Sequence, residues 1–152
     1  MRKNNLLVRV TQTVPRVFLD TSAILAGLNS PSGAAGAMLA YCVIGEIVPL
    51  ISQQVIEEAN RNIAKKFPLL LPAWQSFLLI PPEVVQNPTT QHVTQAYTVL
   101  PTSDAPILAS AIKARPDYLI TWNTKDFLRP KVLASVTFPI LTPGDFLTEY
   151  RS

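Results

Sequence analysis

Near its N-terminus the chain reads Val17-Phe18-Leu19-Asp20-Thr21-Ser22. The apolar run predicts a buried strand, and the polar residues that follow predict the start of a helix. Asp20 therefore falls just beyond the carboxyl end of a strand, where parallel α/β sheets place their sites. Burying a carboxylate there is costly unless a metal ion, a cation or hydrogen bonds receive it. A second interpretation is equally open: Asp20 only caps the helix.

Strand and helix patterns alternate along the rest of the chain. Further strands are predicted over residues 47–51, 83–85, 117–121 and 138–141, and helices over 22–28, 34–45, 52–67, 89–100, 103–114 and 143–150, with Ser52 and Ser103 as N-caps. The segment 68–88 contains five prolines, and only a short helix around 74–78 is predicted before its strand. Strands that alternate with helices indicate an α/β fold with a parallel sheet covered by helices on both faces.

Length and composition indicate one folded domain. The 152 residues are enough to bury a core, and a content of 48% hydrophobic and 15% charged residues argues against disorder. Residues 1–15 are expected to be an N-terminal extension, followed by one domain over residues 16–150. Residues 1–13 lack a signal-peptide core, no apolar stretch reaches the roughly 18 residues of a membrane span, and Cys42 is the one cysteine. We therefore expect a cytoplasmic protein that does not bind a membrane.

Two further acids lie on predicted helices in positions that favour an inward role. Glu58 lies at the edge of the buried face of the helix over 52–67, whereas Glu57 lies further toward solvent. Asp104 shares a face with the apolar residues of the helix over 103–114. Interaction with the helix dipole would explain an acid in the first turn, but not its position on the core side.

Asp126 and Asn123 follow the predicted strand over 117–121, so they leave the sheet at the same edge as Asp20. Asn123 is suited to orienting a water molecule or to forming a turn, and Asp126 to binding a metal ion or capping a helix. Together, these positions predict three or four carboxylates at one end of the sheet, where like charges raise each other's pKa. A hard divalent cation with oxygen ligands, Mg²⁺ or Mn²⁺, is the usual remedy.

Other kinds of site are not supported by the sequence. One histidine, His92, and one cysteine are too few for a zinc site or for a serine- or cysteine-hydrolase constellation. No glycine-rich phosphate loop is present. The net charge of +3 permits a polyanionic partner without requiring one, because the basic residues are scattered. Lys125 and Arg129 lie near the predicted site and are candidates for phosphate contacts.

At these residues the sequence resembles the PIN domain family, and within it the bacterial branch of VapC-type toxin components of toxin–antitoxin pairs. The resemblance rests on the order and spacing of segments 17–22, 51–59, 103–109, 117–127 and 140–147, and it covers about residues 16–150. It implies a three-layer, Rossmann-like α/β/α sandwich around a parallel sheet of about five strands.

The resemblance also implies a metal-dependent endoribonuclease that cleaves RNA phosphodiester bonds, with an antitoxin protein as partner. Its catalytic and metal-binding residues would be Asp20, Glu58, Asp104 and Asp126, supported by Ser22, Thr121 and Asn123. Many relatives have Asn where Ser22 stands and an acid where Asn123 stands. This departure leaves three roles open for Asp126: a direct ligand, a ligand through water, or an anchor for its loop.

Alternatives to a ribonuclease stay open. The first is a catalytically weak or inactive module on the same fold that binds RNA or an antitoxin. The second is a small phosphatase or other Mg²⁺-dependent hydrolase, because a fold does not fix a function. The apolar segments 69–71 and 74–80 exceed what one short helix needs for a core, so a homodimer interface is expected there, unless these segments pack beneath the proline-rich stretch.

Overall fold

The computed structural model describes residues 14–152, so the predicted N-terminal extension lies outside the described residues except for its last two positions. Five parallel strands form one sheet in the order β3-β2-β1-β4-β5. The strands are β1 Arg16–Leu19, β2 Val48–Ile51, β3 Glu83–Val84, β4 Tyr118–Ile120 and β5 Ile140–Leu141. The predicted parallel α/β fold is confirmed.

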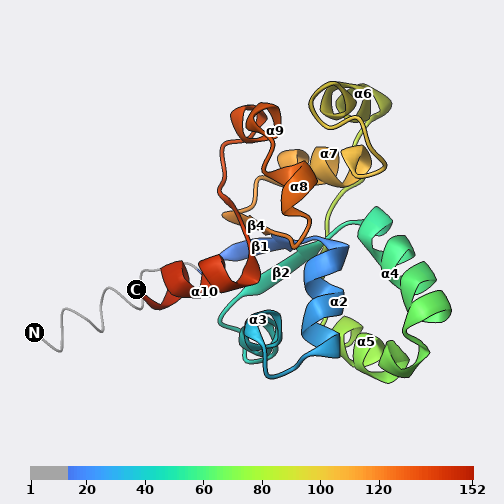
Figure 1. The fold of residues 1–152 in the computed structure, drawn as a ribbon, viewed down its shortest axis with the longest axis vertical. Helices are drawn as coiled ribbons and strands as arrows, with labels where there is room; N and C mark the ends of the chain where they lie inside the picture. The colour runs from blue at the N-terminus through green and yellow to red at the C-terminus, as the bar shows by residue number, and fades with distance from the viewer. Residues whose placement is uncertain (1–13) are drawn as a thin grey trace, which may run out of the picture.

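Helices cover both faces of this sheet. They are α2 Thr21–Asn29, α3 Ala34–Val43, α4 Gln53–Lys66, α5 Leu71–Leu78, α6 Thr90–Val99, α7 Ala105–Ala114, α8 Thr124–Phe127, α9 Pro130–Ser135 and α10 Pro143–Arg151, with a short 3₁₀ turn η1 over Pro68–Leu70. Figure 1 shows α6 and α7 on one side of the sheet and α2, α3 and α5 on the other. The result is the expected three-layer sandwich. No helix within residues 14–152 is long and apolar enough to cross a membrane.

The central strand β1 lies between β2 and β4 and is buried on both faces. Val17, Phe18 and Leu19 are fully buried, as expected for a parallel strand with helices on either side. This continuous apolar run was the pattern that predicted the strand. Because β1 pairs with β4 in register, the residues after these two strands emerge next to each other at the carboxyl edge of the sheet.

The proline-rich stretch is anchored by two aromatic side chains of α5. Trp74 and Phe77 are buried and stacked, with ring centroids 5.9 Å apart. The indole Nε1 of Trp74 donates a hydrogen bond to Oδ1 of Asn60 on α4 over 2.8 Å. This bond satisfies the polar atom of a buried indole and fixes α5 against α4.

The N-terminal cap of one helix was predicted correctly and that of another was not. Ser52 Oγ accepts a hydrogen bond from the Val55 backbone N at 3.1 Å, as expected for an N-cap. The prediction for Ser103 was wrong, because a turn precedes α7: Thr102 Oγ1 accepts from the Asp104 backbone N, and Asp104 takes the N-cap position. Helices α8 and α9 were not predicted, since four and six residues are too few to show helical periodicity.

Gly36 of α3 lies against the backbone of Pro31, and a Cβ at this position would overlap the Pro31 carbonyl group. We expect Gly36→Ala to lower the free energy of unfolding by roughly 1–3 kcal/mol, because backbone rather than a flexible side chain must move. Chemical denaturation measures the change. Gly144→Ala in α10 is the control, since a Cβ there meets nothing within 4 Å. Equal stability of the two variants would contradict this packing argument.

Candidate active site

Asp20 joins the end of β1 to the start of α2 and is only 3% exposed. Its Oδ1 accepts a hydrogen bond from the Thr21 backbone N at 2.8 Å. Its Oδ2 accepts from Ser22 Oγ at 2.9 Å and from Thr121 Oγ1 at 2.8 Å. Asp20 therefore does cap α2, and it is also bonded to the end of β4. Both lone pairs of Oδ2 are used, whereas Oδ1 keeps one free.

The two hydroxyl groups beside Asp20 are forced to act as donors. Ser22 Oγ accepts the backbone N–H of Trp122 at 2.9 Å, and Thr121 Oγ1 accepts that of Asn123 at 2.9 Å. Because each hydroxyl receives a backbone donor, its own hydrogen is available for the carboxylate of Asp20. Ser22 and Thr121 thus hold the buried acid and the loop after β4 together.

Asn123 connects two further acids. Its Nδ2 donates to Asp104 Oδ2 at 2.9 Å and to Asp126 Oδ2 at 3.1 Å. Asp126 Oδ1 in turn accepts from Arg129 Nη2 at 2.9 Å, an ion pair between half-buried side chains. The interpretation of Asp126 as a helix cap is wrong, because it lies in the first turn of α8 while Asn123 takes the N-cap position.

Glu58 approaches this group of acids from α4. It is half-buried, whereas its neighbour Glu57 is exposed, as predicted. Burial is the main reason that the pKa of Glu58 is raised, and the charges of Asp20 and Asp104 raise it further. Glu58 therefore belongs to the same electrostatic group as the acids at the strand ends.

The carboxyl groups of this cluster resist ionisation. Burial raises the pKa of Asp104 to about 6, with further contributions from the charges of Asp20 and Asp126, while the hydrogen bond from Asn123 acts in the opposite direction. Burial also raises the pKa of Asp20, against the lowering effect of its hydrogen bonds from Thr121, Ser22 and Thr21. A cation at the site would relieve this electrostatic cost.

The donor set fits a hard divalent cation. All its candidate ligand atoms are carboxylate oxygens, and the one histidine, His92, is exposed on α6. Within residues 14–152, no three acids, histidines or cysteines lie close enough to hold a metal ion by themselves. Mg²⁺ accepts such a site, because it binds one or two carboxylates and keeps several waters. Thr21, the residue after Asp20, has a buried Oγ1 without a hydrogen-bond partner among residues 14–152.

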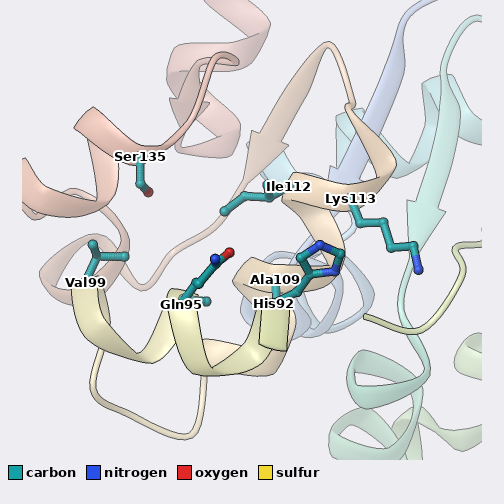
Figure 2. A pocket seen from close by; sticks show the side chains of 8 residues that line it. His92, Gln95, Val99, Ala109, Ile112, Lys113 and Ser135 are labelled. Atoms are coloured by element: carbon teal, nitrogen blue, oxygen red, sulfur yellow. The ribbon is translucent and has the colours of Figure 1, made fainter. Parts of the chain in front are cut away.

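The remaining candidate, Lys125, is exposed on α8. A cavity of about 230 Å³ lies elsewhere, between α6, α7 and α9, and Figure 2 shows the side chains that line it. Its polar lining comes from His92, Gln95, Lys113 and Ser135, and none of the candidate acids lines it. This cavity and the acid cluster are therefore separate features.

The profile of the PIN domain family matches residues 16–125, more than half of the chain. This chain belongs to the PIN domain family. The match contains Asp20, Glu58 and Asp104 and ends one residue before Asp126.

Solved structures agree with this PIN domain fold. PAE2754 from Pyrobaculum aerophilum is similar with a TM-score of 0.60 and 18% identity, covering 90% of this chain and 96% of the other. VapBC2 from Rickettsia felis, solved bound to a DNA fragment from its promoter, is similar with a TM-score of 0.58 and 20% identity, covering 84% and 98%. A comparison with curated proteins gives no match. The resemblance to the PIN domain family seen in the sequence is thereby confirmed.

Sequence reasoning missed how Arg129 is used in this PIN domain. It was a candidate for phosphate contacts, whereas its guanidinium pairs with Asp126. The spacing of three residues between the two is a signal that could have indicated the pair. No pattern in the sequence indicated that the side chain of Asn123 would bond to both Asp104 and Asp126.

The raised pKa of Asp104 predicts a pH-dependent cost to stability. The pKa of Asp104 is about 6 in the folded PIN domain and 3.8 for an ordinary aspartate, so the folded state binds the proton more tightly than the unfolded state does. The ionised carboxylate therefore lowers the free energy of unfolding above about pH 6, and this loss of stability is relieved as pH falls through about 6. We expect metal-free Asp104→Asn to be more stable than the unaltered protein at about pH 7.5 and the difference to shrink by about pH 4.5. Chemical denaturation in EDTA across this range measures both.

Glu57→Gln, which removes an exposed carboxylate from α4, is the control for this experiment. A difference between Asp104→Asn and the unaltered protein that grows as pH falls would contradict the assigned direction.

Proposed function

We propose that this PIN domain is a metal-dependent endoribonuclease and the toxin of a toxin–antitoxin pair. The observation that carries the proposal is the convergence of Asp20, Glu58 and Asp104, each with a raised pKa, at the carboxyl edge of the sheet. Membership of the PIN domain family supports a nuclease, and acids crowded in this way are suited to a divalent cation.

In this proposal Mg²⁺ or Mn²⁺ would be held by Asp104 and by the free lone pair of Asp20 Oδ1. When bound, such a cation would lower the pKa of a water molecule and would stabilise charge on the attacked phosphate. Ser22 and Thr121 keep the Asp20 carboxylate fixed through the hydrogen bonds to Oδ2. Glu58 is placed to accept a proton or a hydrogen bond from water, because its raised pKa brings it closer to neutral pH.

The proposed substrate and partner follow from the surroundings of the site. The net charge of +3 is compatible with a polyanionic substrate, and we propose that the exposed Lys125 on α8 contacts phosphates next to the cleaved bond. The fold shared with VapBC2 supports an antitoxin protein as partner. We propose further that the protein acts in the cytoplasm, where RNA is available, and that its domain spans residues 16–150 after a short N-terminal extension.

Cleavage of RNA tests the proposed activity. We expect cleavage with Mn²⁺ and none with EDTA, and we expect Asp104→Asn to slow it by at least about 100-fold, since residues around a metal site commonly cost this much when replaced. Glu58→Gln should also slow cleavage, whereas Glu57→Gln, the adjacent exposed acid, should not. Gel analysis of single-stranded and structured RNA measures the rates. Unchanged cleavage in Asp104→Asn would refute the mechanism.

A second candidate function is a non-catalytic module that binds RNA or an antitoxin. The uncharged amide of Asn123, which lies between Asp104 and Asp126 where many relatives have an acid, favours this non-catalytic function. The same protein preparation separates the two functions: absence of divalent-cation binding by calorimetry at about millimolar metal, together with RNA binding, would support the module. Hydrolysis of a small phosphoester without RNA cleavage would indicate a phosphatase instead.

A homodimer is proposed through the apolar segments around α5. Trp74 and Phe77 are buried within the domain, but Leu69 and Leu79 remain 92% and 84% exposed. We expect light scattering during size-exclusion chromatography to give about twice the chain mass, and Leu79→Glu to weaken the association, because it places a charge in an apolar contact. Monomer mass at every protein concentration would contradict the interface.

A further inference from the structure

Three side chains form a continuous series of contacts that ends at Asp104. Arg129 Nη2 contacts Asp126 Oδ1 at 2.9 Å, and Asp126 Oδ2 accepts from Asn123 Nδ2 at 3.1 Å. The same amide nitrogen donates its second hydrogen to Asp104 Oδ2 at 2.9 Å. Both hydrogens of one amide are therefore used on two carboxylates.

The direction of the Asn123 amide is set by its neighbours. Ionised carboxylates only accept hydrogen bonds, so the NH₂ end of the amide must face Asp104 and Asp126. Asp126 holds one of the two hydrogens, which aims the other at Oδ2 of Asp104. Oδ1 of Asp104 makes no hydrogen bond within the described chain, so it is the oxygen left for a ligand.

Asp126 differs from Asp104 in that both of its oxygens already have donors. One donor is the guanidinium of Arg129, whose positive charge would repel a metal ion brought to the same carboxylate. The backbone N of Asn123 also bonds to Thr121 Oγ1, which donates to Asp20. Asn123 is thus connected to both proposed ligands, to one by its side chain and to the other by its backbone.

We propose that Arg129 is a positioning residue of this site: it holds Asp126, Asp126 orients Asn123, and Asn123 fixes Asp104, so that Asp126 itself does not bind the metal ion. This inference rests on the proposed metal site and decides between the three roles open to Asp126. An ion pair at this spacing between partly exposed side chains contributes little to stability, so its effect is expected on metal binding.

Calorimetry of Mn²⁺ binding to the full-length protein tests the role of Arg129. We expect Arg129→Gln to weaken binding about tenfold, a usual cost of losing a residue that orients a metal ligand. Lys131→Gln is the matched control, because it removes the same charge from an exposed position of α9 two residues away. Loss of a nearby positive charge by itself strengthens cation binding. We therefore expect Lys131→Gln to bind Mn²⁺ as tightly as the unaltered protein or more tightly, and only Arg129→Gln to bind it more weakly. Arg129→Lys should restore part of the affinity.

Two aspartate variants test the role of Asp126. Asp126→Asn should weaken Mn²⁺ binding about as much as Arg129→Gln, and the double variant should bind no more weakly than either, because both changes break one series of contacts. Asp104→Asn should abolish measurable binding. Thermal unfolding of each variant establishes that it is folded before titration.

The outcomes separate this inference from the proposed function. If the unaltered protein binds no Mn²⁺, the proposed metal site fails and the inference fails with it. If the unaltered protein binds Mn²⁺ but Arg129→Gln behaves as Lys131→Gln does, the inference alone is overturned. Loss of all binding in Asp126→Asn would identify Asp126 as a ligand and would likewise overturn it.

Discussion

The hydrogen bond from Thr121 to Asp20 joins the ends of two adjacent parallel strands. A buried carboxylate is unfavourable, and here three donors offset much of that cost. The same contacts cap α2, fix the loop after β4 and determine which oxygen of Asp20 stays free. The local fold at the carboxyl edge of the sheet and the arrangement of its acids therefore depend on the same hydrogen bonds. A change in one would affect the other.

The cluster at this edge is electrostatically costly for the folded chain. Burial raises the pKa of Asp20, Glu58 and Asp104, and the charges of nearby acids raise the pKa of Glu58 and Asp104 further. No cation among residues 14–152 is hydrogen-bonded or ion-paired with these three acids. A protein selected only for stability would not keep such a group of acids. In the proposed function this electrostatic cost favours cation binding, because a cluster without charge would have little affinity for a cation.

Much of this arrangement could be predicted from the sequence, because its signals are local. Strands and helices follow from apolar periodicity, and the rule that parallel strands end at one edge places Asp20 near the loop that carries Asn123. The turn at Thr102, which displaced the expected cap, could not be predicted, because two adjacent hydroxyl residues compete for one role. The contacts of Arg129 with Asp126 depend on the path of a loop, and sequence periodicity does not describe loops.

The distance along the chain between Asp20 and Thr121 has a consequence for biosynthesis. The two residues are separated by 101 positions, so β1 leaves the ribosome long before the strand that completes its site. Until β4 has been made and has paired with β1, Asp20 lacks the hydrogen bond from Thr121 and has only local donors in Thr21 and Ser22, and this edge of the sheet is unformed. An incomplete chain carries the acids without their arrangement.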